Sequence, residues 1–159
     1  SHSGCHMDAP WHYFPTMNNG EPSRTIDQVP LEYCFSDGVH LDFSQWDPRK
    51  IIHADDIRRV LDQMEYQLKP LDIVLLESGA APHFGQPDYT SYGAGVSEEA
   101  TVWLMEQGIK VVGTDSWINC RDTDSRSSAS RSSLRAPAQG GPVPSHYWIS
   151  EFGGDPIQS

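Results

Sequence analysis

The residues best suited to chemistry stand at the amino-terminal end of the chain. His2, His6, Asp8 and His12 are separated by even numbers of residues. Because side chains of a strand alternate between its two faces, all four would lie on one face of an extended segment. Imidazole and carboxylate groups are good ligands for a divalent metal ion. Four of them on one face favour a metal site over the alternative of four unrelated surface side chains.

The spacing limits which of these residues can share one ion. His6 and Asp8 are two residues apart, about 6.6 Å along a strand, and can bind the same ion. His2 and His6 are four residues apart, about 13 Å along a straight strand. Either the chain bends near Gly4, which tolerates unusual backbone angles, or the two histidines bind different ions.

His12 is the candidate for proton transfer beside the metal. It follows Pro10, which interrupts regular strand pairing, so we expect it to act as a free acid or base. Its neighbours Trp11, Tyr13 and Phe14 are aromatic and could form the walls of an apolar pocket. Packing in the core is the alternative and is the more common role of aromatic side chains.

The first twelve residues resemble the His-x-Gly-Thr-His-x-Asp-x-Pro-x-His signature of the metal-dependent cyclase family. That family includes bacterial-type kynurenine formamidase and isatin hydrolase. The matching positions are His2, Gly4, His6, Asp8, Pro10 and His12. Cys5 stands where threonine is usual, and its odd position should face it away from the ligands. The resemblance continues in the family's order to about residue 117, with landmarks at residues 55–56, 71–79, 95–100 and 113–117.

The resemblance implies a fold and an activity. The fold would be α/β of the swivelling β/β/α type, incomplete at both ends, in homodimers whose subunits complete each other's pockets. The activity would be metal-dependent hydrolysis of a carbon–nitrogen amide bond, in an aryl formamide or a small cyclic amide. His2, His6 and Asp8 would hold Zn²⁺ or Mn²⁺, and His12 would relay a proton to the leaving nitrogen. Trp11 and Phe14 are assigned to substrate binding.

The chain departs from the family after Trp117. Residues 121–135 contain four arginines and repeated serines, and 136–145 consist of Ala, Pro, Gln, Gly, Val and Ser, which predicts disorder or loose coil. We predict a cyclase-like domain over 1–117, a low-complexity segment over 118–145 and a tail over 146–159. For the family's late histidine and glutamate ligands, the only candidates of the right types are His146 and Glu151, in surroundings that do not match. The departure favours an alternative: a catalytically inactive, truncated or alternatively spliced paralogue that only binds metal or dimerises.

Composition excludes some partners. Eleven basic against twenty-two acidic residues give a net charge of −11, which disfavours nucleic acid and anionic membranes. No apolar run approaches the length of a membrane span. No signal-peptide pattern is present either. Because the chain starts inside its motif, a targeting segment could precede it. Three widely spaced cysteines fit neither a zinc finger nor a disulfide framework, so we expect a reducing, cytoplasmic compartment.

The elements that must position the motif follow from hydrophobic periodicity. An apolar stripe predicts a helix over 54–68, and Ser97 followed by acids predicts another over 97–107. Predicted strands cover 26–32, 39–43, 71–76 and 109–113, the third of them fully buried. The order strand, helix, strand over 71–113 predicts two parallel strands. The loop over 80–96 is expected to form a rim of the pocket.

The strand predicted over 39–43 also places two polar side chains together. Val39, Leu41 and Phe43 should face inward, which leaves His40 and Asp42 on the opposite face. A metal or substrate role for this pair is one interpretation. A solvated or hydrogen-bonded pair is the more common arrangement of such residues.

Overall fold

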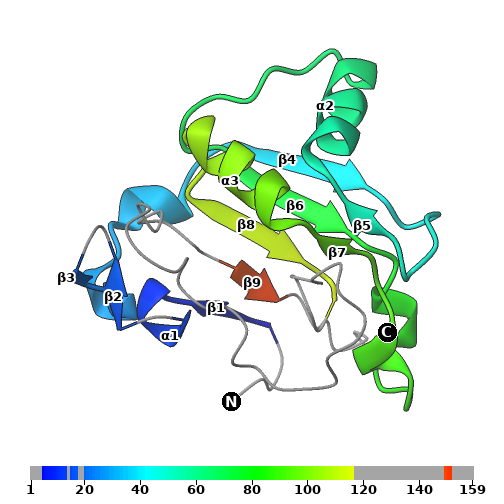
Figure 1. The fold of residues 1–159 in the computed structure, drawn as a ribbon, viewed down its shortest axis with the longest axis horizontal. Coiled ribbons are helices and arrows are strands. Elements are labelled where there is room, and N and C mark those ends of the chain that lie inside the picture. The colour runs from blue at the N-terminus through cyan, green and yellow to red at the C-terminus, as the bar shows by residue number, and fades with distance from the viewer. Residues whose placement is uncertain (1–4, 14, 18–19, 117–148, 152–159) are drawn as a thin grey trace, which may run out of the picture.

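The fold is organised around a five-stranded sheet (Figure 1). The structure is a computed structural model and describes residues 5–13, 15–17, 20–116 and 149–151. The strand order is β1–β9–β8–β6–β4. Strands β4, β6, β8 and β9 run parallel, and β1 pairs with β9 in the antiparallel direction. The strand bounds are β1 His6–Asp8, β4 Gly38–Asp42, β6 Ile73–Glu77, β8 Val111–Thr114 and β9 Ile149–Glu151.

Two helices cover one face of this sheet, α2 (Ala54–Gln63) and α3 (Glu98–Glu106) (Figure 1). Their apolar side chains form one core with the inward residues of β4 and β6. The predicted order strand, helix, strand is confirmed, because β6, α3 and β8 follow each other and the two strands are parallel. Helix α2 is shorter than predicted: Met64 ends it, and Glu65 adopts a positive φ of 53°.

The alternation predicted over 39–43 is confirmed. Val39, Leu41 and Phe43 are buried in the core, whereas His40 and Asp42 are exposed on the opposite face. Strand β6 was expected to be buried throughout, and that prediction is wrong. Only its alternate residues are buried, because the helices cover one face of the sheet and leave the other partly open.

The strand predicted over 26–32 is wrong. The chain there forms two 3₁₀ turns, η1 (Ile26–Gln28) and η2 (Leu31–Cys34). Local hydrogen bonds compete with strand pairing: the Thr25 N–H donates to Gln28 Oε1 at 3.0 Å, and Pro30 has no N–H to donate. The turns carry partly buried apolar residues onto the second face of the sheet, in a small cluster that contains Ala9, Val111, Met7, Val29, Tyr33 and Ile73.

Among the described residues of the amino-terminal motif, those of β1 form an extended strand. A single helical turn, α1 (Pro10–Tyr13), follows it, and the His12 N–H closes this turn on the Ala9 carbonyl at 2.8 Å. Proline is well suited to the first helical position, where its fixed φ is helical and its missing N–H is not needed. His12 therefore does not continue the strand that carries His6 and Asp8, in agreement with the expectation that Pro10 interrupts regular pairing.

The remaining elements are short. A hairpin of β2 (Thr16–Met17) and β3 (Glu21–Pro22) follows α1, and β5 (Ile51–Ile52) pairs with β7 (Gly95–Val96). The expected loop over 80–96 contains the turns η3 (Ala81–His83) and η4 (Tyr89–Ser91) as well as β7. The segment predicted to be low in complexity, 118–145, lies outside the described residues. Within the described part of the chain, no helix combines the length and apolar character needed to cross a membrane.

Candidate active site

Three polar side chains of the motif gather around the carboxylate of Asp8. His6 Nε2 lies 3.7 Å from Asp8 Oδ2, and His12 Nδ1 lies 3.8 Å from Asp8 Oδ1. The Tyr13 hydroxyl donates a hydrogen bond to Oδ2 at 3.3 Å. Each carboxylate oxygen therefore has one imidazole beside it.

The local backbone accounts for this arrangement. His6 and Asp8 are alternate residues of β1, so they project from the same face of the strand. The turn of α1 then brings His12 back toward Asp8, four residues earlier in the chain. The exposed fractions of the side chains are 21% for His6, 13% for Asp8 and 47% for His12. Asp8 is thus the most enclosed of the three, and His12 is the most accessible to solvent and ligands.

The donor atoms of His6 and Asp8 suit a shared metal ion. Zinc bonds to imidazole nitrogen and carboxylate oxygen are about 2.0–2.2 Å long, so two ligands of one tetrahedral ion lie about 3.4 Å apart. The 3.7 Å between His6 Nε2 and Asp8 Oδ2 is close to that spacing. Within the described residues, no three histidine, cysteine, aspartate or glutamate side chains converge on one ion. The 3.8 Å between His12 Nδ1 and Asp8 Oδ1 is almost the same as the 3.7 Å between His6 and Asp8, so both histidines lie at a distance from Asp8 that suits two ligands of one ion.

The structure describes only some of the other residues that the sequence assigned to the site. His2 and Phe14 lie outside the described residues, as does His146. Trp11 is on α1 with 61% of its surface exposed, so it is available to a ligand and is not a core residue. Glu151 belongs to β9, and its Cα is the register partner of His6 in the antiparallel pairing of β1 with β9.

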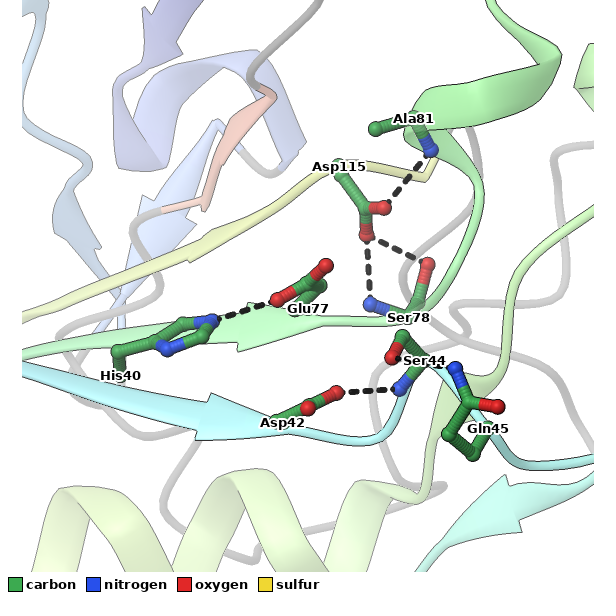
Figure 2. A network of polar contacts seen from close by, with 8 residues as sticks. All are labelled: His40, Asp42, Ser44, Gln45, Glu77, Ser78, Ala81 and Asp115. Carbon is green, nitrogen blue, oxygen red and sulfur yellow. Dashed lines mark hydrogen bonds and ion pairs between the residues drawn. The ribbon is translucent and has the colours of Figure 1, made fainter.

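A second polar cluster stands at the carboxyl ends of β4, β6 and β8 (Figure 2). Asp115, directly after β8, accepts hydrogen bonds from Ser78 N and Ser78 Oγ, both at 2.6 Å, and from Ala81 N at 2.8 Å. The Tyr89 hydroxyl also donates to the Asp115 carbonyl at 3.0 Å. These bonds fasten the start and the middle of the loop over 79–92 to the end of β8. No local sequence pattern could indicate this role, because Asp115 and its partners are 26 to 37 residues apart in the chain.

Two glycines allow this close approach. Gly79 has a φ of +84°, and a Cβ there would lie 2.7 Å from the Ser44 carbonyl oxygen. Gly93 has a φ of +102°, and a Cβ there would lie 2.5 Å from Ser78 Oγ. Only glycine suits these two positions, because the positive φ strains other residues and a Cβ would collide with neighbouring atoms.

His40 and Asp42 interact with neighbouring polar groups. His40 Nε2 lies 2.9 Å from Glu77 Oε2, as Figure 2 shows. Hydrogen bonds from the side chain and backbone of Ser44 lower the pKa of Asp42 below its ordinary value, although partial burial opposes this. Within the described residues this cluster has no third ligand for a metal ion. The arrangement agrees with a hydrogen-bonded surface pair.

The fold and the motif together define a class of protein, an α/β protein of the cyclase type. A family model with the description "Putative cyclase" matches residues 1–118, which is most of the chain. The chain belongs to the cyclase family, as its motif and the order of its later landmarks predicted. No curated protein sequence matches the chain.

Solved structures show the same fold. One is an isatin hydrolase bound to the product analogue thioisatinate, 19% identical, with a TM-score of 0.62 over 72% of this chain and 47% of that chain. Another is a novel cyclase, 20% identical, with a TM-score of 0.55 over 70% of this chain and 44% of that chain. The predicted α/β cyclase-like fold is confirmed. The chain spans less than half the length of these two proteins.

We predict that Asp115→Ala destabilises the fold by about 3 kcal/mol, because three hydrogen bonds to a charged acceptor are lost. Urea denaturation followed by circular dichroism measures this change. Asp47→Ala is the matched control: Asp47 is exposed and pairs only with Arg49, two residues away, so the unfolding midpoint should change little. Equal midpoints for the two variants would contradict the role of Asp115.

Proposed function

We propose that the chain is a metal-dependent hydrolase that cleaves a carbon–nitrogen amide bond through a metal-activated water. The observation that supports this most directly is the placement of one imidazole beside each oxygen of Asp8. This arrangement provides a ligand pair and a separate proton carrier within a single short segment. Membership of the cyclase family and the fold shared with an isatin hydrolase add support.

His6 and Asp8 would hold the ion, together with His2 as the sequence predicts. Nitrogen and oxygen ligands without sulfur suit Zn²⁺ and Mn²⁺ alike. When bound, such an ion polarises a carbonyl group and lowers the pKa of a coordinated water toward about 7. The Tyr13 hydroxyl would keep the Asp8 carboxylate in its orientation through the hydrogen bond to Oδ2.

His12 would carry the proton. An imidazole with an ordinary pKa of about 6.5 can take a proton from water and deliver it near neutral pH. With Nδ1 3.8 Å from Asp8 Oδ1, the carboxylate would hold the orientation of the ring. In the reaction, the water oxygen forms a bond to the carbonyl carbon, the carbon–nitrogen bond breaks, and the proton passes through His12 to the leaving nitrogen.

The substrate would be an aryl formamide or a small cyclic amide. The exposed indole of Trp11, directly before His12, offers a surface on which an aromatic ring can stack. The isatin hydrolase of the same fold was solved with thioisatinate as a product analogue. Phe14 remains a predicted second contact. We place the enzyme in the cytoplasm and expect it to form a homodimer.

A second candidate is a paralogue without catalytic activity. One observation favours it: after Trp117 the sequence departs from the family's pattern, so the family's late histidine and glutamate ligands have no matching counterpart there. Such a chain would bind metal weakly or only dimerise. The two candidates differ in turnover and in metal affinity, and both can be measured.

We predict that the chain, loaded with zinc or manganese and then desalted, retains about one equivalent of metal. His6→Ala and Asp8→Asn should each weaken metal binding more than tenfold, because each removes a direct ligand. Elemental analysis by mass spectrometry provides the measurement. His40→Ala is the control, since this histidine pairs with Glu77 away from the motif. Less than a tenth of an equivalent in the unaltered chain would reject the site.

We predict that His12→Ala lowers kcat for hydrolysis of formylkynurenine or isatin by about 10²- to 10⁴-fold, the usual contribution of a positioned acid or base. Bound metal should stay unchanged, because His12 lies outside the ligand pair. Product formation followed by absorbance, together with metal content, separates these effects. His40→Ala, which alters an exposed histidine paired with Glu77 away from the motif, should keep normal turnover. Stoichiometric metal without turnover in the unaltered chain would support the inactive paralogue instead.

A further inference from the structure

Ser23 and Arg24 are adjacent residues, each with a buried polar side-chain atom that has no hydrogen-bond partner among the described residues. Ser23 is 4% exposed. Its Oγ and the Nη1 of Arg24 are shielded from solvent, and neither has a hydrogen-bond partner within the part of the chain that the structure describes. Shielding a polar group without a hydrogen bond costs free energy, and the cost is larger for a charged group. A ligand that offered hydrogen-bond acceptors to both neighbouring residues would remove this cost.

The charge of the missing ligand follows from the guanidinium. Arginine stays protonated at any physiological pH, so the group that completes Arg24 must accept hydrogen bonds and is best an anion. The other arginines with described ion pairs each contact a nearby carboxylate. These pairs are Arg49 with Asp47, Arg58 with Asp55, and Arg59 with Asp56. Arg24 differs from these arginines because no ion pair joins it to a carboxylate among the described residues. This contrast stands out in a chain that has twice as many acidic as basic residues.

The position of the two residues connects them to the candidate active site. The Trp11 N–H donates to the Arg24 carbonyl at 3.1 Å, and the Ser23 N–H donates to the Pro15 carbonyl at 3.0 Å. The backbone at 23–24 therefore runs beside the segment that carries His12. In Figure 1, α1 and the hairpin of β2 and β3 lie together beside the end of β1.

We propose that Arg24 and Ser23 bind the carboxylate of a small aromatic acid beside the candidate metal site. A guanidinium can donate two parallel hydrogen bonds to a carboxylate, and the serine hydroxyl can donate a further one. Trp11 is exposed, and its N–H donates a hydrogen bond to the Arg24 carbonyl. Its indole offers a stacking surface for the aromatic ring of the acid. The inference rests on the proposed function only where it narrows the substrate: the preferred amide would itself carry a carboxylate group in addition to the bond that is cleaved.

The test compares benzoate with benzamide, which has the same shape and no charge. Titration calorimetry on the full chain, freed of metal with a chelator, should give at least tenfold tighter binding of benzoate. Arg24→Met should remove this preference, and Ser23→Ala should reduce it. Arg49→Met removes an exposed arginine that already has a carboxylate partner, so it should keep the preference. Equal binding of the two probes, or a preference that survives Arg24→Met, would overturn the proposal.

Thermal unfolding separates a ligand-binding role from a structural one. Arg24→Met should leave the melting temperature of the ligand-free chain unchanged or higher, and should abolish the increase caused by benzoate. A lower melting temperature with the benzoate-induced increase intact would mean that Arg24 is structural, and would overturn the proposal. A second result would also overturn the proposal: Arg24→Met changes the oligomeric state of the chain but keeps benzoate binding. The partner of Arg24 would then be a carboxylate side chain of another protein chain. Since no metal or turnover is needed, failure here is distinct from failure of the hydrolase assignment.

Discussion

The enclosure of the Asp8 carboxylate is the constraint on which the candidate site depends. A carboxylate that is largely withdrawn from water must be compensated by hydrogen bonds or positive charge. The Tyr13 hydroxyl supplies one hydrogen bond, and imidazoles stand beside both oxygens. This is possible because an extended strand ends at Asp8 and a helical turn begins two residues later. A longer strand would carry His12 away from the carboxylate.

The sheet and its loops hold this segment in place by interactions that are distant in sequence. Strand β1 lies at one edge of the sheet and pairs with β9, which in turn pairs with β8. At the carboxyl end of β8, Asp115 fastens the loop that follows β6. The helices cover only one face, and their packing against β4 and β6 supplies the main core. The two polar clusters therefore lie at the edge of the sheet and at the ends of its strands, whereas the apolar core lies at its centre.

Local patterns explain what the sequence predicted well. The alternation over 39–43 and the Ser97 cap, whose Oγ accepts from Ala100 N at 3.1 Å, both depend on residues within one element. The error over 26–32 arose because side-chain hydrogen bonds at Thr25 outweigh a weak strand propensity. A one-turn helix such as α1 is too short to produce a periodic signal.

The candidate site was predictable in its residue types and not in its geometry. The motif identified His6, Asp8 and His12, but the assignment of one histidine to each carboxylate oxygen needed the turn of α1. The partners of Asp115 are 34 to 37 residues away, so no local pattern could reveal its role. The lack of a partner for Arg24 within the described residues is likewise a property of packing, which composition does not report.

The most direct measurement of the central claim is a zinc titration of the chain followed by nitrogen NMR of its histidine imidazoles. The account predicts that His6 Nε2 moves to the position of a metal-bound nitrogen at one equivalent of zinc. The ring nitrogens of His12 should not move to the position of a metal-bound nitrogen. An unchanged His6 spectrum at one equivalent, or zinc held by the thiolates of Cys5 and Cys34 instead, would contradict the account.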